Sequence, residues 1–299
     1  MKDVVSAPLT IERRSASSVA DYLQLAKPRL NVLVVATSAA GYYLGGPPAP
    51  DLALMAQAVA GTALVAGGAA VLNQVYERDT DALMRRTRLR PLPDGRVSPA
   101  DARLFGFGLS ISGLLLLALR ANWLSAALAL ATLVIYLVVY TPMKRRTPLS
   151  TLVGAVPGAL PALIGWTASH GSIAIGGATL FAIVFLWQIP HFMAIAWLYR
   201  DDYGKAGFPM LPVIEPGGRR AGRQAVVYAA ALVPVSLVPA IVGIAGSVYF
   251  GSALVLGLVL LVLAVRFAFT RSEGSARALF IGSITYLPLL WIVMIGDRL

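Results

Sequence analysis

The sequence predicts an all-α integral membrane protein with nine transmembrane helices. Three observations lead to this fold class. The 299-residue chain is 58% hydrophobic and only 13% charged, whereas soluble domains carry about 25% charged residues. Its apolar runs match the roughly 20 residues that an α-helix needs to cross a bilayer, and they lack the alternation of membrane β-strands. Basic residues are concentrated in alternate loops between these runs.

The apolar runs define the predicted elements, and each is interpreted as one membrane span. Residues 1–29 are predicted to form a polar cytoplasmic segment, and residues 30–295 a single transmembrane domain. A polar start followed directly by two spans argues against a cleaved signal peptide. The chain has no cysteine, which excludes disulfides, thiolate metal sites and a cysteine nucleophile. The predicted spans are 30–45, 54–77, 103–119, 122–140, 149–168, 173–198, 225–246, 248–268 and 278–295.

The net charge of +11 is explained by membrane topology. Of the 25 Lys and Arg residues, 23 lie in or at the edges of the N-terminal segment and the even-numbered loops, and only Arg120 and Arg298 lie on the other side. Cytoplasmic loops of membrane proteins are enriched in Lys and Arg, so we expect the N-terminus inside and the C-terminus outside. The same charge attracts anionic lipid. A nucleic-acid partner is therefore not expected.

Two cytoplasmic loops resemble each other in layout. "NQVYERDTDALMRRTRLRPLP" follows the second span, and "YRDDYGKAGFPMLPVIEPGGRR" follows the sixth. Each begins with carboxylates near the membrane surface and continues into a proline-containing turn. The offset of four helices predicts two four-helix repeats in the same orientation, with a ninth helix added. Internal repeats of this kind commonly hold the site at their interface.

Polar residues at the end of the second span have the spacing of one helix face. Asn73, Glu77 and Asp81 are four residues apart and should stack, whereas Asp79 should point elsewhere. Two carboxylates at a low-dielectric boundary repel each other, and a cation between them relieves the cost. Oxygen ligands suit Mg²⁺, which is often completed by substrate phosphate.

The second acidic loop and nearby basic residues extend this candidate site. Asp201 and Asp202 are further candidate metal ligands, and Asp202 joins the first three as a candidate catalytic residue. Cationic side chains at the same membrane surface can bind diphosphate oxygens. Each basic residue alone can also be explained by membrane topology or by contact with lipid headgroups. The alternative for Glu77 and Asp81 is that they lie at a solvated helix end. The candidate diphosphate-binding residues are Arg88, Lys144, Arg145 and Lys205.

Three long segments resemble the intramembrane UbiA-type prenyltransferase superfamily. They are "NQVYERDTDALMRRTRLRPLP", "YTPMKRRTPLSTLVGAVPGALPALIGW" and "FLWQIPHFMAIAWLYRDDYGKAGFPMLPV". Together they are most similar to the branch of that superfamily that farnesylates haem B. The resemblance extends over residues 20–295, essentially the whole chain.

The resemblance implies a Mg²⁺-dependent enzyme of nine helices around a central cavity in a bacterial inner membrane. Such an enzyme transfers the farnesyl group of farnesyl diphosphate to a vinyl group of haem B and adds water, which yields haem O and diphosphate. Haem O is used by terminal oxidases or converted to haem A. Contact with a haem A synthase or with the oxidase assembly machinery is a further implied possibility.

The resemblance can be carried over residue by residue in the first motif. Asn73, Glu77 and Asp81 match it, with Glu77 at a position where relatives can carry Asp. The second motif departs from that of quinone-pathway members, which have an acid at both outer positions. Here those positions are Tyr199 and Tyr203, so the second metal ligand is open, with Asp202 favoured. Tyr199 and Tyr203 are either hydroxyl ligands or aromatic residues at the membrane interface.

One histidine lies inside a predicted span. His191 is ten residues before Asp201, which places it about 15 Å along a helix from the acidic cluster. Aided by the resemblance, we interpret it as an axial ligand of haem iron. The alternative is a hydrogen bond to a carbonyl group that Pro190 leaves free.

Three other functions compete with this interpretation. A prenyltransferase of the quinone pathway would act on an aromatic acid, but "WQIPHF" and "YRDDY" argue against it. A secondary transporter also has repeats and kinked helices, yet its site usually lies near the middle of the bilayer. A non-catalytic haem scaffold would release no diphosphate, which distinguishes it from the enzyme.

Overall fold

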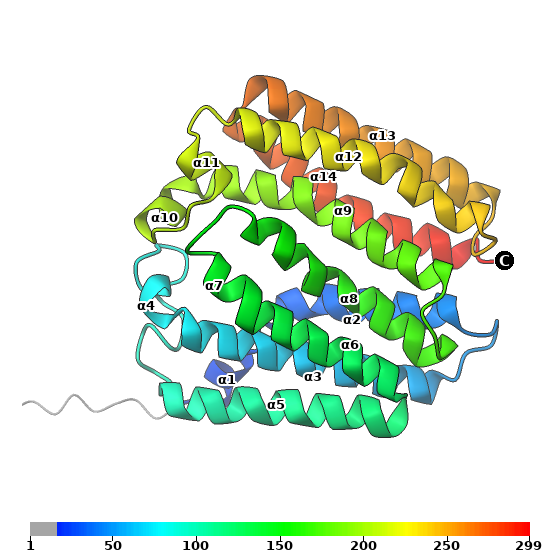
Figure 1. Cartoon of the computed structure of the whole chain (residues 1–299), viewed down its shortest axis with the longest axis horizontal. Helices are drawn as coiled ribbons and strands as arrows, with labels where there is room; N and C mark the ends of the chain where they lie inside the picture. The colour runs from blue at the N-terminus through cyan, green and yellow to red at the C-terminus, as the bar shows by residue number, and fades with distance from the viewer. Residues whose placement is uncertain (1–16) are drawn as a thin grey trace, which may run out of the picture.

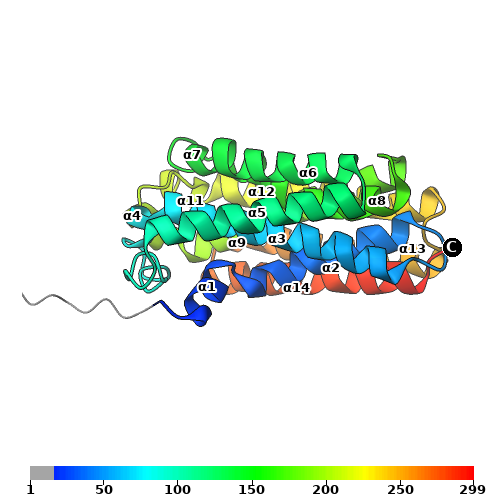
Figure 2. The ribbon, with the colours of Figure 1, turned by 90° about the horizontal axis from the view of Figure 1, so that it is seen from below.

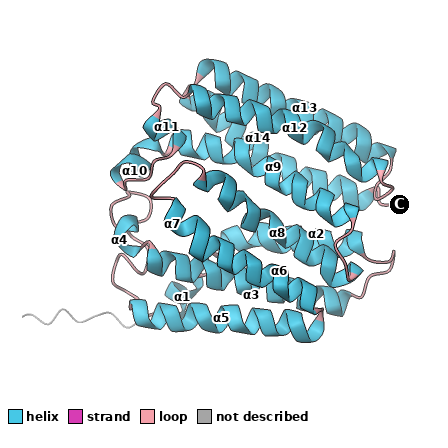
Figure 3. Ribbon diagram, in the orientation of Figure 1, coloured by secondary structure: helices cyan, strands magenta, loops and turns pink. Residues whose placement is uncertain are grey.

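The structure is a computed structural model that describes residues 17–299. Residues 1–16 of the predicted N-terminal segment therefore lie outside the described part. Helices and loops make up the described chain, as Figure 3 shows. The long helices run side by side along one axis in both perpendicular views (Figures 1 and 2). The all-α fold class predicted from the sequence is therefore correct.

Every predicted span coincides with a helix in the described residues. The seventh span is displaced most, because α12 begins six residues earlier than predicted and ends five residues earlier. The long helices are α2 (Pro28–Gly45), α3 (Leu52–Tyr76), α5 (Pro99–Arg120), α6 (Trp123–Val134), α8 (Ser150–His170), α9 (Ile175–Leu198), α12 (Arg219–Ile241), α13 (Ser247–Thr270) and α14 (Glu273–Gly296). The short helices are α1 (Val19–Leu25), α4 (Arg78–Asp81), α7 (Thr141–Met143), α10 (Arg200–Lys205) and α11 (Leu211–Ile214).

Eight helices in residues 17–299 are long and apolar enough to cross a membrane, with α6 continuing through α7 to Met143. The molecule is thus a multi-pass membrane protein. The remaining predicted span, α2, has 18 residues and packs against α8 and α3 inside the bundle. Its first turn contains Arg29 and Asn31, and these polar residues lower its hydropathy below that of the other helices.

The helices begin where the sequence provides a capping side chain. The Asp51 carboxylate accepts a hydrogen bond from the Leu54 amide at the start of α3. Ser98 caps α5, and Pro99 follows at the first helical position, where a missing N–H costs nothing. Asn122 caps α6 in the same way. These caps satisfy amide groups that would otherwise lack partners.

A π-helix, η1 (Ile135–Tyr140), interrupts the span between α6 and α7. Pro142 has no amide hydrogen, and the Thr141 amide and hydroxyl both bond to the Tyr136 carbonyl, five residues back. Short π-helical segments often occur at functional sites because they rotate the residues that follow. Here the rotation sets the direction of Thr141 and Lys144.

Small residues allow α2 and α8 to approach closely. A Cβ atom added to Gly41 would collide with the Ala162 carbonyl oxygen, and one added to Gly165 would collide with that of Ser38. Close backbone approach at small residues is typical of membrane helix packing. The contact joins the first and fifth long helices of the chain.

The order of helix contacts repeats along the chain. α2 contacts α3, α3 contacts α5, and α5 contacts α6. α8, α9, α12 and α13 contact one another in the same succession, and α14 packs against α13, α9 and α2. The short helices α4, α7, α10 and α11 all lie at one end of the bundle, opposite the C-terminus (Figure 1).

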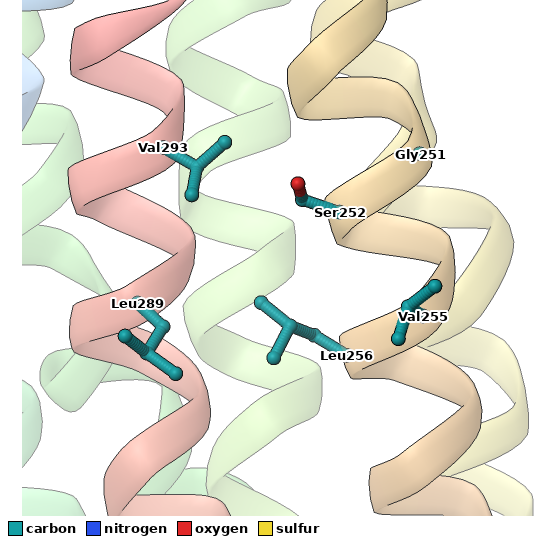
Figure 4. A pocket seen from close by; sticks show the side chains of 6 residues that line it. All are labelled: Gly251, Ser252, Val255, Leu256, Leu289 and Val293. Carbon is teal, nitrogen blue, oxygen red and sulfur yellow. The ribbon is translucent and has the colours of Figure 1, made fainter.

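A groove of about 370 Å³ runs between α13 and α14 on the outside of the bundle. Figure 4 shows its apolar side chains, among which Ser252 supplies the single hydroxyl group. The groove contains no titratable side chain. Its lining matches the acyl region of a membrane rather than a site for charged substrates.

Candidate active site

The polar residues predicted from the first motif lie together at the end of α3. Asn73, Glu77 and Asp81 are 2%, 6% and 1% exposed. Helix α3 ends at Tyr76, but the amides of Glu77 and Asp81 still bond four residues back, so the three side chains stay on one face across the α3–α4 junction. The Asp79 side chain is 89% exposed and pairs with Arg78, which confirms that it points elsewhere.

A buried ion pair joins the first motif to the loop after α7. The Lys144 ammonium donates to both carboxylate oxygens of Glu77, at 2.8 and 3.1 Å. It also lies 5.0 Å from the centre of the Tyr140 ring. Burial by itself lowers the pKa of Lys144, but the nearby Tyr140 and Glu77 together raise it above its ordinary value. The lysine is therefore charged at neutral pH.

Asp81 is held by a second cation. Arg90 Nη1 donates to Asp81 Oδ2 at 2.8 Å, and the Thr87 hydroxyl donates to the Asp81 backbone carbonyl at 2.7 Å. These contacts fold the loop after α4 back over the acidic residues. Arg90 was not among the predicted diphosphate-binding residues, because its pairing depends on how this loop turns.

Asn73 connects the first motif to the π-helix. Its Nδ2 donates to Thr141 Oγ1 at 3.0 Å, and Thr141 in turn donates to the Tyr136 carbonyl at 2.7 Å. This arrangement uses one end of the Asn73 amide for positioning and leaves Oδ1 as an acceptor. The amide oxygen is therefore available beside Glu77.

The two acidic loops, which follow the second and sixth spans, lie against each other at this end of the bundle. Met84 from the first loop belongs to the same buried apolar cluster as Phe208 and Met210 from the second. The Arg86 guanidinium lies 5.2 Å above the Tyr199 ring, and Lys144 lies 5.7 Å from the Phe208 ring centre. The loops after the second and sixth spans therefore form one surface, as their shared layout predicted.

The carboxylates of the second loop do not join the first pair in this structure. Asp201 is exposed and Asp202 is half-buried on α10. Within residues 17–299, no group of three or more acidic or histidine side chains is close enough to hold one metal ion. The parts of Asp201 and Asp202 in metal binding stay a prediction.

The predicted diphosphate-binding residues differ in position. Lys144 contacts Glu77, whereas Arg88, Arg145 and Lys205 are exposed on the same end of the bundle. Exposed cations at the rim can meet an anion as it arrives. In the described part of the chain, none of these three forms an ion pair with Glu77 or Asp81. Their roles stay predictions.

Lys27 is a further cation at the site that the motif spacing did not reveal. It lies between α1 and α2 with a positive φ of 50°, an unusual backbone for a residue other than glycine. Gln74 Nε2 donates to the Leu25 carbonyl at 2.7 Å, and Asn31 Nδ2 donates to the Ala26 carbonyl at 3.0 Å. The Gln74 bond ties this strained turn to α3, and the Asn31 bond ties it to α2.

The charge around Lys27 is unbalanced. Burial, together with the positive charges of Arg90 and Lys144, lowers the pKa of Lys27 to about 7, against the opposing effect of Glu77 and Asp81. Three cations thus share the field of two carboxylates. An anionic ligand would restore the balance. The dipeptide Lys27–Pro28 ahead of a span is the sequence signal that could have indicated this position.

His191 lies on α9 facing α14, away from the ion pairs. Its Nδ1 is 2.8 Å from Ser283 Oγ, and its ring stacks between Trp187 and Phe280 with centroid distances of 5.1 and 5.2 Å. The partner is a side chain on another helix. The alternative prediction, a bond to a carbonyl freed by Pro190, is therefore wrong for the Nδ1 atom.

The donor set of the first motif fits Mg²⁺. Glu77 and Asp81 provide carboxylate oxygens and Asn73 provides an amide oxygen, all buried together at the bundle end. Hard divalent cations prefer such oxygen ligands, and Mg²⁺ keeps several waters or phosphate oxygens besides. Lys144 and Arg90 now neutralise the same carboxylates, which shows that this position favours positive charge.

The sequence of the chain is similar to those of known prenyltransferases. Residues 34–291 match the model of the UbiA prenyltransferase family. The chain is 47% identical over 287 residues to the protoheme IX farnesyltransferase of Solibacter usitatus, which covers 93% of this chain and 98% of that protein. It is 45% identical to the protoheme IX farnesyltransferase of Koribacter versatilis, with 98% of both chains covered.

Solved structures share the fold. A digeranylgeranylglyceryl phosphate synthase aligns over 93% of this chain and 98% of its own, with a TM-score of 0.79 and 17% identity. A UbiA homologue from Archaeoglobus fulgidus, solved with GPP and Mg²⁺ bound, aligns over 92% of this chain and 99% of its own, with a TM-score of 0.65 and 19% identity. The chain therefore belongs to the UbiA prenyltransferase family and, within it, to the protoheme IX farnesyltransferases.

Proposed function

We propose that this protein transfers the farnesyl group of farnesyl diphosphate to a vinyl group of haem B, with addition of water, to form haem O and diphosphate. The observation that carries this proposal is the buried pair Glu77 and Asp81, neutralised by Lys144 and Arg90 at the bundle end where the two acidic loops meet. The names of the relatives supply the substrates.

The site suits a ligand that brings anionic and metallic charge together. Carboxylates buried in an apolar bundle need a cation, and cations beside them need an anion. A metal–diphosphate complex satisfies both at once. The GPP and Mg²⁺ bound to the Archaeoglobus homologue have this composition.

Glu77 and Asp81 would hold Mg²⁺, with Asn73 beside them and Asp202 or Asp201 from the second loop. When bound, Mg²⁺ neutralises charge on the departing diphosphate. Lys144, Arg88, Arg145 and Lys205 would bind the diphosphate oxygens, and Lys144 already reaches the acidic pair. Charge-assisted bonds of this kind strengthen as negative charge accumulates on the leaving group.

The chemistry then follows from charge placement. The bond between farnesyl C1 and the diphosphate oxygen breaks, and the electron pair leaves with the diphosphate. The π electrons of the vinyl group form the new carbon–carbon bond. Water adds to the other vinyl carbon and releases a proton. The apolar helices exclude bulk water until that step, which protects the allylic cation.

His191 would orient the haem as an axial ligand of its iron. Its ring stacks with two aromatic rings and is hydrogen-bonded at Nδ1, so its direction would be set before haem binds. A preoriented ligand lowers the entropic cost of bringing the vinyl group to the farnesyl carbon. In this proposal the diphosphate would lie at the bundle end and the macrocycle deeper among the helices.

The finer architecture belongs to the same proposal. We infer that α2 also crosses the membrane, which gives nine spans in residues 30–295, arranged as two four-helix repeats plus α14 around a central cavity. The distribution of basic residues supports an N-terminus in the cytoplasm and a C-terminus outside, in a bacterial inner membrane. Membrane lipid surrounds the bundle, and a haem A synthase or terminal oxidase assembly factor would receive the product.

A reconstituted assay tests the function. The purified full chain in lipid nanodiscs is given haem B, farnesyl diphosphate and Mg²⁺, and the pigment is extracted for mass analysis while released diphosphate is measured. We expect haem O and diphosphate in equal amounts. Prenylation of 4-hydroxybenzoate instead of haem would favour the quinone-pathway alternative, and haem binding without diphosphate release would favour a scaffold.

A further inference from the structure

Ser283 on α14 sits at the centre of a small hydrogen-bonded group beside His191. Its side chain is fully buried. Its hydroxyl donates to the Phe280 carbonyl at 2.7 Å, and its oxygen lies 2.8 Å from His191 Nδ1. Its own backbone carbonyl accepts a bond from Trp187 Nε1 at 2.7 Å. The farnesyl transfer itself assigns Ser283 no role.

The hydrogen bonds determine which nitrogen of His191 carries the proton. A serine hydroxyl has one donor, and that of Ser283 is directed at the Phe280 carbonyl. Ser283 Oγ must then accept from His191 Nδ1–H. A neutral imidazole has a single N–H, so the lone pair is on Nε2. Among residues 17–299, no hydrogen bond reaches Nε2.

We propose that Ser283 is a positioning residue that fixes His191 in the Nδ1–H tautomer, with the Nε2 lone pair available to haem iron. This inference rests on the proposed role of His191 as a haem ligand. The stacked Trp187 and Phe280 rings set the plane of the imidazole, and Ser283 sets its rotation and its proton. A hydrogen bond from Nδ1–H also makes Nε2 a stronger donor to a metal.

The experiment uses haem B titrations of the purified full chain. Haem affinity is read from the Soret band, and the iron–histidine stretching frequency is read from resonance Raman spectra of the ferrous complex. Ser283→Ala removes the hydroxyl group but keeps the backbone carbonyl that Trp187 uses. Ser283→Thr keeps a hydroxyl group. Thr285→Ala is the matched control, because Thr285 also bonds back to its own helix but is exposed.

We expect Ser283→Ala to lower the iron–histidine frequency and to weaken haem binding by about 10- to 100-fold, the usual cost of losing a partner of a metal-bound histidine. Ser283→Thr should restore both values, and Thr285→Ala should match the wild type. Mg²⁺-dependent binding of farnesyl diphosphate should persist in all three, which reports an intact fold.

Two results would overturn the inference in different ways. An unshifted iron–histidine frequency in Ser283→Ala, with or without weaker binding, would reduce Ser283 to a packing role while His191 remained the ligand. A haem spectrum that is unchanged in His191→Ala would remove both the proposed ligand and the role of Ser283.

Discussion

Lys144 Nζ lies 2.8 and 3.1 Å from the two carboxylate oxygens of Glu77, across 67 residues of sequence. The lysine therefore covers the oxygens that a metal ion would need. In the proposed function, Lys144 would move to the diphosphate oxygens, and Glu77 would then be free to hold Mg²⁺. Until substrate binds, the ion pair keeps a buried carboxylate neutralised.

Variants of the Glu77–Lys144 pair should affect the stability of the fold and the turnover of the enzyme differently. Lys144→Met leaves the buried Glu77 unpaired and should lower the free energy of unfolding by about 3–5 kcal/mol. The double variant Glu77→Leu with Lys144→Met removes both charges and should regain most of that loss, yet show no turnover. Thermal unfolding in detergent and diphosphate release measure the two effects. Wild-type stability of Lys144→Met would contradict the conclusion that Lys144 neutralises a buried Glu77.

The carboxylates of the first motif should be essential for turnover. Glu77→Gln and Asp81→Asn should each reduce diphosphate release by at least about 100-fold, because the charge that holds Mg²⁺ is lost. Asp79→Asn is the matched control and should stay within about twofold, since its side chain is exposed. Wild-type activity of Glu77→Gln at limiting Mg²⁺ would rule out a metal ligand at this position.

Lys27 should make diphosphate binding depend on pH. The pKa of Lys27 is about 7 without ligand. At neutral pH about half of the molecules therefore have an uncharged Lys27, which must take up a proton before it can bind an anion as a cation. Affinity for farnesyl diphosphate at fixed Mg²⁺ should therefore fall above pH 7, by up to about tenfold per pH unit. In Lys27→Arg the charge is permanent, and this component should vanish.

The comparison of Lys27→Arg with the wild type also removes the titration of the diphosphate itself, which affects both proteins equally. Parallel pH profiles would contradict a role for Lys27.

The lowered pKa of Lys27 also affects the stability of the fold. Between pH 7 and 10.5 the unfolded chain binds more protons at Lys27 than the folded chain, so this group makes stability rise with pH in that window.

Removal of the histidine should separate the two substrates. His191→Ala should weaken haem B binding by about 10- to 100-fold and change the Soret spectrum. Binding of farnesyl diphosphate with Mg²⁺ should survive, because the ion pairs involve α3, α4 and the loop after α7. Loss of both substrates together would point to a structural role for His191 in the packing of α9 on α14.

The topology can be tested with reporter fusions. Fusions after residues 47, 95, 145 and 215 should report outside, inside, inside and inside, because basic residues surround the last three positions. An outside signal at 95 or 215 would place the two acidic loops on the wrong side of the membrane for one shared site.

The sequence determined the membrane class, the approximate ends of the helices and the first motif. Apolar runs of span length leave a chain few alternatives in a bilayer, because only helices satisfy their own backbone groups there. Spacing by four placed Asn73, Glu77 and Asp81 on one face, since that relation is local to one helix. The end of α12 was misplaced by five residues because hydropathy continues smoothly into the turn that follows.

Only the tertiary structure decided the partners of these residues. Arg90 and Lys144 could be told from the other arginines and lysines only once the loops had folded, because cations at one membrane surface look alike in sequence. The bond between Asn73 and Thr141 and the bond between His191 and Ser283 each join distant segments. Such contacts depend on helix packing, which hydrophobic periodicity does not encode.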